Sequence, residues 1–244
     1  MPGRDGYRQY CPIAIAAEVM GERWTPLVIR GLFCGASRFN DIQRSVPRMS
    51  SSLLSRRLRE LEEAGVIAHH EAPGATGARY ALTPAGEALF PVLEQMGVWA
   101  QTHLRPEILE SRNLDPDLLM WEIRHAAIDR GAAADAPDPD ARPPTRRVAC
   151  FRLDGVPVAK RFYWLVFEAG DVDICLRDPG HPVDLHVHAH IRDLVAVWLG
   201  HERLETARED GRLRLEGARG EIAAFTRWFA LSHFARVPPG LAAE

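Results

Sequence analysis

Arginine side chains gather in one short stretch of the sequence, between residues 38 and 59. This stretch holds six arginines against one acid, Asp41, so its local charge is +5 although the whole chain carries −3. Guanidinium groups pair with phosphate oxygens and can also chelate guanine. Because a polyanion responds to local charge and not to the total, the pattern predicts a nucleic-acid contact. The six are Arg38, Arg44, Arg48, Arg56, Arg57 and Arg59.

Three histidines, His186, His188 and His190, alternate with apolar residues near the middle of the C-terminal half. A strand would place all three imidazoles on one face, a spacing that can bind zinc. Three nitrogens along a straight strand span about 13 Å, however, and converge poorly on one ion. A polar face in contact with solvent is the favoured interpretation, and no metal is predicted.

The four cysteines, Cys11, Cys34, Cys150 and Cys175, lie far apart and form no Cys-x-x-Cys pair. Neither a disulfide framework nor a zinc ribbon is therefore indicated. No Ser-His-Asp order, glycine-rich phosphate loop or paired-carboxylate motif rises above chance, so we expect neither an enzyme nor a bound cofactor. The chain contains no signal-peptide pattern and no run of eighteen or so apolar residues. We expect a cytoplasmic protein without a membrane contact.

The arginine-rich stretch must be positioned by helices. Apolar spacing and turn residues predict three helices over residues 12–21, 25–35 and 37–47. Ser50 is typical of the cap of a fourth helix, in which Leu54, Leu58 and Leu61 form the buried stripe before Gly65 ends it. The residues left outward are Ser51, Ser52, Ser55, Arg56, Arg59 and Glu62.

Two strand-like runs, 66–70 and 79–82, flank a loop of turn formers at residues 73–77. Thr83-Pro84 then predicts the start of one long helix that reaches about Leu104. Helices, a hairpin and a closing helix within residues 10–105 match a winged helix-turn-helix layout, whose second motif helix enters the major groove. Here that helix is 50–64. The candidate DNA contacts are Arg38, Arg48, Ser50, Ser51, Ser52, Ser55, Arg56, Arg59 and Arg79.

Several ordered motifs in this region resemble the HxlR-type regulators: Tyr10-Cys11-Pro12-Ile13, Gly21-Glu22-Arg23-Trp24-Thr25, Arg38-Phe39-Asn40-Asp41-Ile42, and the stretches 54–65 and 80–86. The resemblance implies a homodimer joined through its terminal helices and a double-stranded, inverted-repeat operator. Some HxlR-type proteins sense oxidants or electrophiles with the cysteine that matches Cys11. No Lys or Arg adjoins Cys11, although a helix N-terminus would favour its thiolate. A buried, structural Cys11 is the alternative.

The C-terminal half has strand-length runs at residues 147–153, 161–168, 171–177 and 183–190, which predict an antiparallel sheet. Helices are expected over 191–199 and 220–234, and a further strand over 213–215. The fold class is therefore α+β, with an N-terminal winged helix-turn-helix. The predicted domains are 1–105 for DNA binding and dimerisation, 106–145 as a connecting helix and Pro-rich linker, and 146–244 for ligand binding.

Leu199-Gly200, Ala207, 211–217 and 222–225 together resemble sterol-carrier-protein-2-like domains, a likeness that spans roughly 114–236. The resemblance implies an apolar tunnel for a lipid-like ligand. The same aromatic residue types also fill ordinary cores. On a continuous helix, Trp228 and Phe229 would not face the same way. The candidate ligand contacts are Trp164, Phe167, Trp198, Phe225, Trp228 and Phe229.

Three functional hypotheses follow from these patterns. The first is a transcriptional regulator, expected to be a repressor, whose C-terminal domain senses a small apolar or lipid-like effector. The second is a repressor switched by oxidation or modification of Cys11. The third is a lipid-binding or carrier protein that uses its winged helix for protein interaction.

Overall fold

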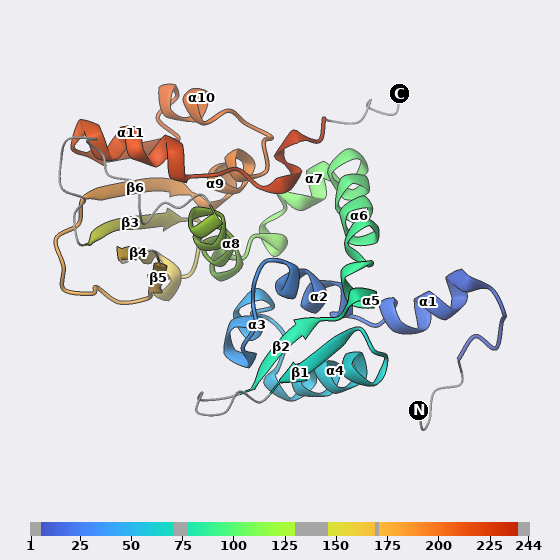
Figure 1. Ribbon diagram of the computed structural model, residues 1–244. Helices are drawn as coiled ribbons and strands as arrows, with labels where there is room; N and C mark the ends of the chain where they lie inside the picture. Colours follow the sequence, from blue (N-terminus) through green and yellow to red (C-terminus); the bar gives the residue numbers. More distant parts are fainter. Residues whose placement is uncertain (1–5, 71–77, 130–145, 169–170, 239–244) are drawn as a thin grey trace, which may run out of the picture. The chain divides into compact units, whose positions relative to one another are not determined.

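The computed structural model describes residues 6–70, 78–129, 146–168 and 171–238. The chain divides into two compact units, Met1–Met96 and Gly97–Glu244, and each is described here by itself (Figure 1). The predicted domain limits at residues 105 and 146 stay predictions. No helix in the described part of the chain is long and apolar enough to span a membrane.

The first unit consists of short helices and a hairpin. Apolar residues at helical spacing meet in its core, where Ile29, Ile42, Leu54, Leu58 and Leu61 are at most 2% exposed. Its elements are α1 (Pro12–Met20), α2 (Thr25–Phe33), α3 (Phe39–Ser45), α4 (Ser51–Glu63), β1 (Ile67–His70), β2 (Arg79–Leu82), α5 (Pro84–Glu87) and the first part of α6 (Phe90–His103). This arrangement is the helix-turn-helix with a wing that the sequence predicts.

The wing hairpin is joined to the turn between α2 and α3. Strands β1 and β2 pair antiparallel from Ile67 opposite Leu82 to His70 opposite Arg79. Arg38 forms an isolated bridge with Arg79, and the Tyr80 N–H donates to the Ser37 carbonyl over 2.7 Å. The predicted loop at residues 73–77 lies outside the described residues.

The closing helix is interrupted, so the prediction of one helix from Thr83 to Leu104 is wrong. The Thr83 hydroxyl caps α5 by accepting from the Gly86 N–H over 3.1 Å, but α5 ends at Glu87 and α6 begins at Phe90. Pro91 explains the interruption, because it has no N–H for the Glu87 carbonyl and its ring would clash with that carbonyl in a continuous helix.

The second unit is built on a five-stranded sheet in the order β5-β4-β3-β6-β7. Its strands are β3 (Arg147–Asp154), β4 (Phe162–Glu168), β5 (Asp171–Cys175), β6 (Leu185–His190) and β7 (Leu213–Gly217). Its helices after α6 are α7 (Arg105–Ile108), η1 (Ser111–Asn113), α8 (Pro116–Asp129), η2 (Val158–Lys160), α9 (Ile191–Trp198), α10 (Leu204–Glu209), α11 (Arg219–Trp228) and η3 (His233–Arg236).

This sheet is mixed, which corrects the prediction of an antiparallel one. Strands β3, β4 and β5 form an antiparallel meander, but β6 lies parallel to β3, from Leu185 opposite Ala149 to His190 opposite Asp154. The chain leaves β5 at one edge and crosses through residues 176–184 to the far side of β3. A parallel neighbour requires such a crossover, and strand periodicity does not reveal which connection makes one.

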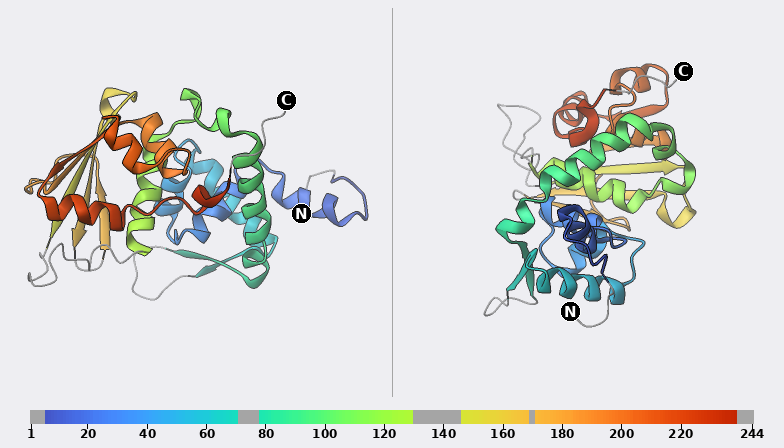
Figure 2. Two further views of the ribbon diagram at one scale, coloured as in Figure 1. Left: turned by 90° about the horizontal axis from the view of Figure 1, so that it is seen from above. Right: turned by 90° about the vertical axis from the view of Figure 1, so that its right-hand side faces the viewer.

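One face of the sheet carries the core of the second unit. Phe151, Leu165 and Val187 point into it from three adjacent strands, and Ile123 of α8 and Leu194 of α9 pack against them. Figure 2 shows the twist of the sheet with α11, drawn in red, beside it. Because β-strand side chains alternate, the even-numbered residues of β3, β4 and β6 lie on the opposite face.

The last turns of α6 and the first residue of α7 are held in the second unit by three contacts. Gln101, 4% exposed, accepts a hydrogen bond from Nε2 of His201 over 2.6 Å, and Arg105 donates to the Gly200 carbonyl over 3.3 Å. A Cβ at Gly97 would lie 2.3 Å from the ring of Phe234, so only glycine allows this approach. Burial, followed by the charge of Arg105, lowers the pKa of His201 to about 4.

The lowered pKa of His201 predicts a pH dependence of stability. The unfolded chain takes up a proton near pH 6.5 while the folded chain does not until about pH 4, so stability is complete above pH 6.5 and falls below it. We expect about 2 kcal/mol of this loss between pH 7 and pH 5. His201→Gln keeps an N–H donor and should remove this component when urea unfolding is compared at the two pH values. An identical pH dependence in the variant and the wild type would contradict the assignment.

Candidate nucleic-acid interface

Helix α4 carries the predicted recognition surface. The Ser50 hydroxyl caps it by accepting from the Leu53 N–H over 3.3 Å, as predicted. The leucine stripe of α4 is buried, and on the opposite side Ser51, Ser52, Arg56 and Arg59 are exposed. A helix fixed by one face therefore presents hydroxyls and guanidiniums from the other.

The remaining predicted contacts lie around α4 in sequence. Arg38 occupies the N-cap position of α3 without a side-chain capping bond, Arg48 lies exposed in the turn before α4, and Arg79 begins β2. The bridge between Arg38 and Arg79 brings these two residues together beside the end of the hairpin where β1 ends and β2 begins. Ser55 is half-buried, and its hydroxyl donates to the Ser51 carbonyl over 3.0 Å.

Arg56 forms only a loose ion pair with Glu60, at 3.8 Å, and its side chain is 56% exposed. Water and salt compete strongly with such an exposed pair. A phosphate or a base edge can replace Glu60 as the partner of Arg56 at little cost.

Arg57 does not belong to the anion-facing surface, which corrects its place among the six arginines of the predicted nucleic-acid contact. It is 3% exposed, and its two terminal nitrogens donate to Glu60 over 2.6 Å and to Glu22 over 3.0 Å. It thereby fixes α4 to the turn that precedes α2. The helical spacing contained the signal, since position 57 lies between Leu54 and Leu61 on the buried stripe.

The aromatic candidates of the second unit fall on two faces of its sheet. Phe225 contacts Trp228 and Phe229 with ring centroids 5.0 Å and 4.7 Å away, and Phe167 and Trp198 join the same core cluster. Trp164 alone lies on the opposite face, stacked on Phe162. The structure therefore brings five of the six candidates together.

Trp228 and Phe229 are both buried in that core, contrary to the expectation for one continuous helix. Helix α11 ends at Trp228, and Phe229 leaves helical geometry with φ −72° and ψ 74°. The change of backbone conformation turns the second ring back toward Phe225.

The three histidines of β6 have two different roles. The rings of His186 and His188 lie 6.1 Å apart, whereas Nδ1 of His190 accepts from the Arg192 N–H over 3.2 Å and caps α9. Burial lowers the pKa of His188. Among the residues that the structure describes, no three His, Cys, Asp or Glu side chains are grouped so as to hold a metal ion.

Cys11 directly precedes α1 at its N-cap position and is half-buried, while Cys34 is exposed. Burial, with a smaller effect of Asp178, raises the pKa of Cys150 to about 11. Burial and then Asp173 raise the pKa of Cys175. These shifts disfavour the thiolate at the two cysteines of the sheet.

The fold and the exposed face of α4 define a winged helix-turn-helix of the DNA-binding class. The family model described as HxlR-like helix-turn-helix matches residues 19–108. The uncharacterized HTH-type transcriptional regulator YvaP of Bacillus subtilis is 34% identical over 104 residues, which are 42% of this chain and 96% of that protein. The chain therefore belongs to the HxlR-like family of transcriptional regulators.

A second relative, the HTH-type transcriptional regulator YodB of Bacillus subtilis, is 34% identical over 98 residues, 39% of this chain and 88% of that protein. The solved structure of YodB in its reduced form is 34% identical to this chain. The match covers 40% of this chain and 98% of the YodB chain, with a TM-score of 0.35.

The buried position of Arg57 predicts a large effect of its replacement on stability. Arg57→Met should lower the free energy of unfolding by about 2 kcal/mol, because Glu22 and Glu60 lose their shared counter-ion. Arg59→Met, at an exposed position of the same helix, should change it by less than about 0.5 kcal/mol. Urea unfolding of both variants measures the difference. Equal stabilities would show that the Arg57 pairs contribute nothing.

Proposed function

We propose that this regulator is a homodimer that reads an inverted-repeat operator with α4. The observation that carries the proposal is the exposed face of α4, where Ser51, Ser52, Arg56 and Arg59 lie opposite a buried leucine stripe. Hydroxyls and guanidiniums in the first turns of a recognition helix are the groups that reach base edges. In this proposal Ser55 belongs to the same reading face, although its hydroxyl also bonds the Ser51 carbonyl.

Phosphate contacts would come from the flanks of this helix. Arg48 and Ser50 precede α4, and the bridged pair Arg38 and Arg79 adds two guanidiniums where β2 begins. Arginine and serine side chains commonly hold the DNA backbone in this way and fix the register of the recognition helix. These residues would then position α4 while contributing little sequence information themselves.

Exposed apolar side chains on the terminal helices of the first unit support a dimer. In α1, Ile13 and Ile15 are 78% and 53% exposed, and in α6 Val92 and Met96 are 49% and 51% exposed. Apolar residues concentrated in this way favour a protein interface. A two-fold dimer would place its two recognition helices on half-sites about 34–36 Å apart.

Replacement of Arg56 or Arg59 by alanine tests the reading face. If either arginine reads a base, we expect a loss of about 1–3 kcal/mol in binding, mainly at one operator position. If it contacts phosphate, the loss should be uniform over sequences and the salt dependence weaker. Fluorescence anisotropy with a duplex selected by the wild-type protein from a random library measures both effects.

Arg203→Ala is the matched control for these variants, because this guanidinium is 82% exposed on the second unit. Unchanged binding by all three variants would exclude α4 as the reading helix. It would favour the third hypothesis, in which a lipid-binding or carrier protein uses its winged helix for protein contact.

For the second unit we propose an SCP2-like fold that senses a small apolar or lipid-like effector. The five clustered aromatic residues Phe167, Trp198, Phe225, Trp228 and Phe229 support this role, because apolar pockets are lined by such side chains. Regulation requires that the effector bind the DNA-competent and incompetent states with different affinity. Helix α6 suits the coupling, because it begins in the DNA-binding unit and ends in the second unit.

A thiol switch through Cys11 is the second candidate mechanism. The relative YodB has been solved in diamide-treated and quinone-bound forms. In this chain Cys11 lies at the N-terminus of α1, which carries the exposed Ile13 and Ile15. Addition of its thiolate sulfur to a quinone ring carbon forms a C–S bond, and the ring takes up the thiol proton to become a hydroquinone. The bulky adduct would then stand beside the proposed dimer surface.

Cys11→Ser tests this switch. Benzoquinone should release DNA from the wild type but not from the variant, because serine does not form the adduct under these conditions. Cys34→Ser is the control, since Cys34 is exposed and should leave the release unchanged. Anisotropy with and without benzoquinone measures the release, and its persistence in Cys11→Ser would exclude the switch.

A further inference from the structure

Strand β7 is an edge of the five-stranded sheet. It pairs with β6 from Leu185 opposite Gly217 to Ala189 opposite Leu213. In the part of the chain that the structure describes, no strand pairs with its other side. An edge strand presents backbone N–H and C=O groups that can pair with a further strand.

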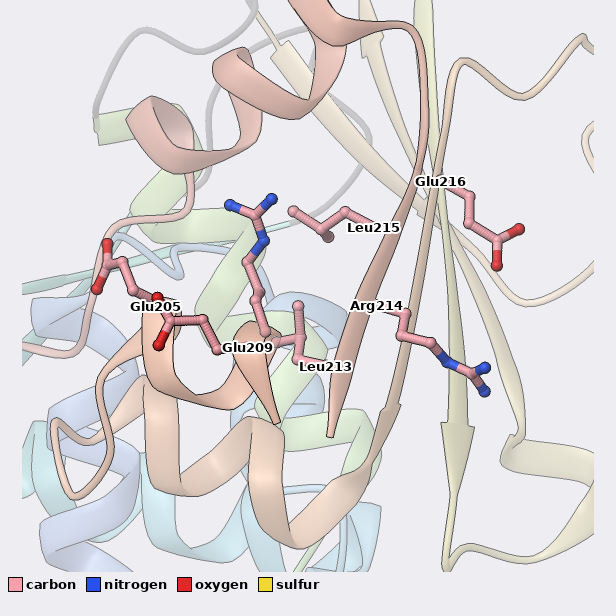
Figure 3. Close-up of a pocket in the computed structure, with 7 residues that line it drawn as sticks. Glu205, Glu209, Leu213, Arg214, Leu215 and Glu216 are labelled. Atoms are coloured by element: carbon pink, nitrogen blue, oxygen red, sulfur yellow. The ribbon is translucent and has the colours of Figure 1, made fainter. Parts of the chain in front are cut away.

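A groove of about 530 Å³ follows this edge between β7 and α10. Figure 3 shows Leu213 and Leu215 pointing from β7 toward the side of α10, where Glu205 and Glu209 lie, and Arg214 and Glu216 pointing to the other side. Residues from both faces of β7 line the groove, so the groove exposes the edge of the strand itself.

The charges on β7 are self-complementary about Leu215. When two copies of this strand run antiparallel with Leu215 opposite Leu215 of the partner subunit, Arg214 lies opposite Glu216 of the partner subunit, and the reverse pair forms as well. Opposite charges at directly facing positions stabilise strand pairs. Within the described residues, no ion pair within 4.0 Å includes Arg214 or Glu216, although both charges act on His188 of β6.

We propose that β7 pairs with β7 of a second copy of this chain, which joins two five-stranded sheets into one continuous sheet. The contact is isologous, because the same residues lie on both sides of a two-fold axis through Leu215. Helix α10 fits this arrangement, since its groove residues Glu205, Arg208 and Glu209 also carry both signs of charge. A strongly basic or strongly acidic partner would leave half of these charges unpaired, whereas a second copy matches both.

A contact of five residues per strand is small beside a standard protein interface of about 1,600 Å². It is therefore weak by itself and gains strength where another contact already holds two copies at a high effective concentration. The proposal does not depend on whether α4 reads DNA, and it predicts a second self-association surface besides α1 and α6.

Charge exchange on β7 tests the pairing in the full-length chain. Arg214→Glu gives a strand with two acids, and Glu216→Arg gives a strand with two arginines. Each single variant should self-associate through β7 about tenfold more weakly, because two attractive pairs become repulsive. The double variant Arg214→Glu/Glu216→Arg restores both pairs and should associate like the wild type.

An equimolar mixture of the two single variants gives the sharpest result. The acidic strand of one variant then faces the basic strand of the other, so pairing should recover although each variant alone pairs about tenfold more weakly. Recovery on mixing also shows that both variants are folded. Arg152→Glu, an exposed exchange on the same face of β3, is the matched control and should have no effect.

Hydrogen–deuterium exchange of residues 213–217 at low and high protein concentration locates the contact. Pairing should increase the protection of β7 at high concentration in the wild type, the double variant and the mixture, whereas the protection of β5, the opposite edge, should not change with concentration and serves as the internal reference. Absence of concentration-dependent protection in the wild type would overturn the proposal and indicate a different occupant, such as a peptide of another protein. Failure of the mixture to recover protection would overturn it as well.

Discussion

The ion pairs of the buried Arg57 guanidinium are the interaction on which the orientation of α4 depends. Leucines alone let an amphipathic helix rotate or slide slightly on its core, because apolar packing has little directionality. Two short, charge-assisted hydrogen bonds, to Glu22 and to Glu60, are directional and fix α4 against the turn before α2. The exposed serines and arginines of α4 then occupy fixed positions, as recognition of base edges requires.

Much of the first unit could be predicted from local chemistry. Ser50 caps α4, and the antiparallel strands β1 and β2 lie where expected, because caps and apolar periodicity are determined by neighbouring residues. Pro91 was the local signal that the closing helix is interrupted. The parallel pairing of β3 with β6 left no such signal, because strand order depends on the path of the chain between distant residues.

The candidate site also has residues whose positions the sequence predicts and residues whose positions it does not predict. Exposure of Ser51, Ser52, Arg56 and Arg59 follows from helical periodicity, but a count of charges treats Arg57 like its neighbours. Only its position on the leucine stripe separates it from them. Likewise, residue type grouped Trp164 with the core aromatics, whereas alternation along β4 places it on the opposite face from Phe167. Chemistry alone does not locate a side chain, and periodicity has to be applied residue by residue.

The contacts of α6 also bear on where the chain could be divided. The division between the two units falls inside this helix, after Met96, and its next turns carry the buried amide of Gln101 and the glycine that admits Phe234. A DNA-binding fragment that extended through His103 would expose the buried amide of Gln101 and the surface that Phe234 covers at Gly97. Division of the chain after these turns would therefore lower the solubility of the fragment, whereas division before Gly97 keeps the contacts within the second unit.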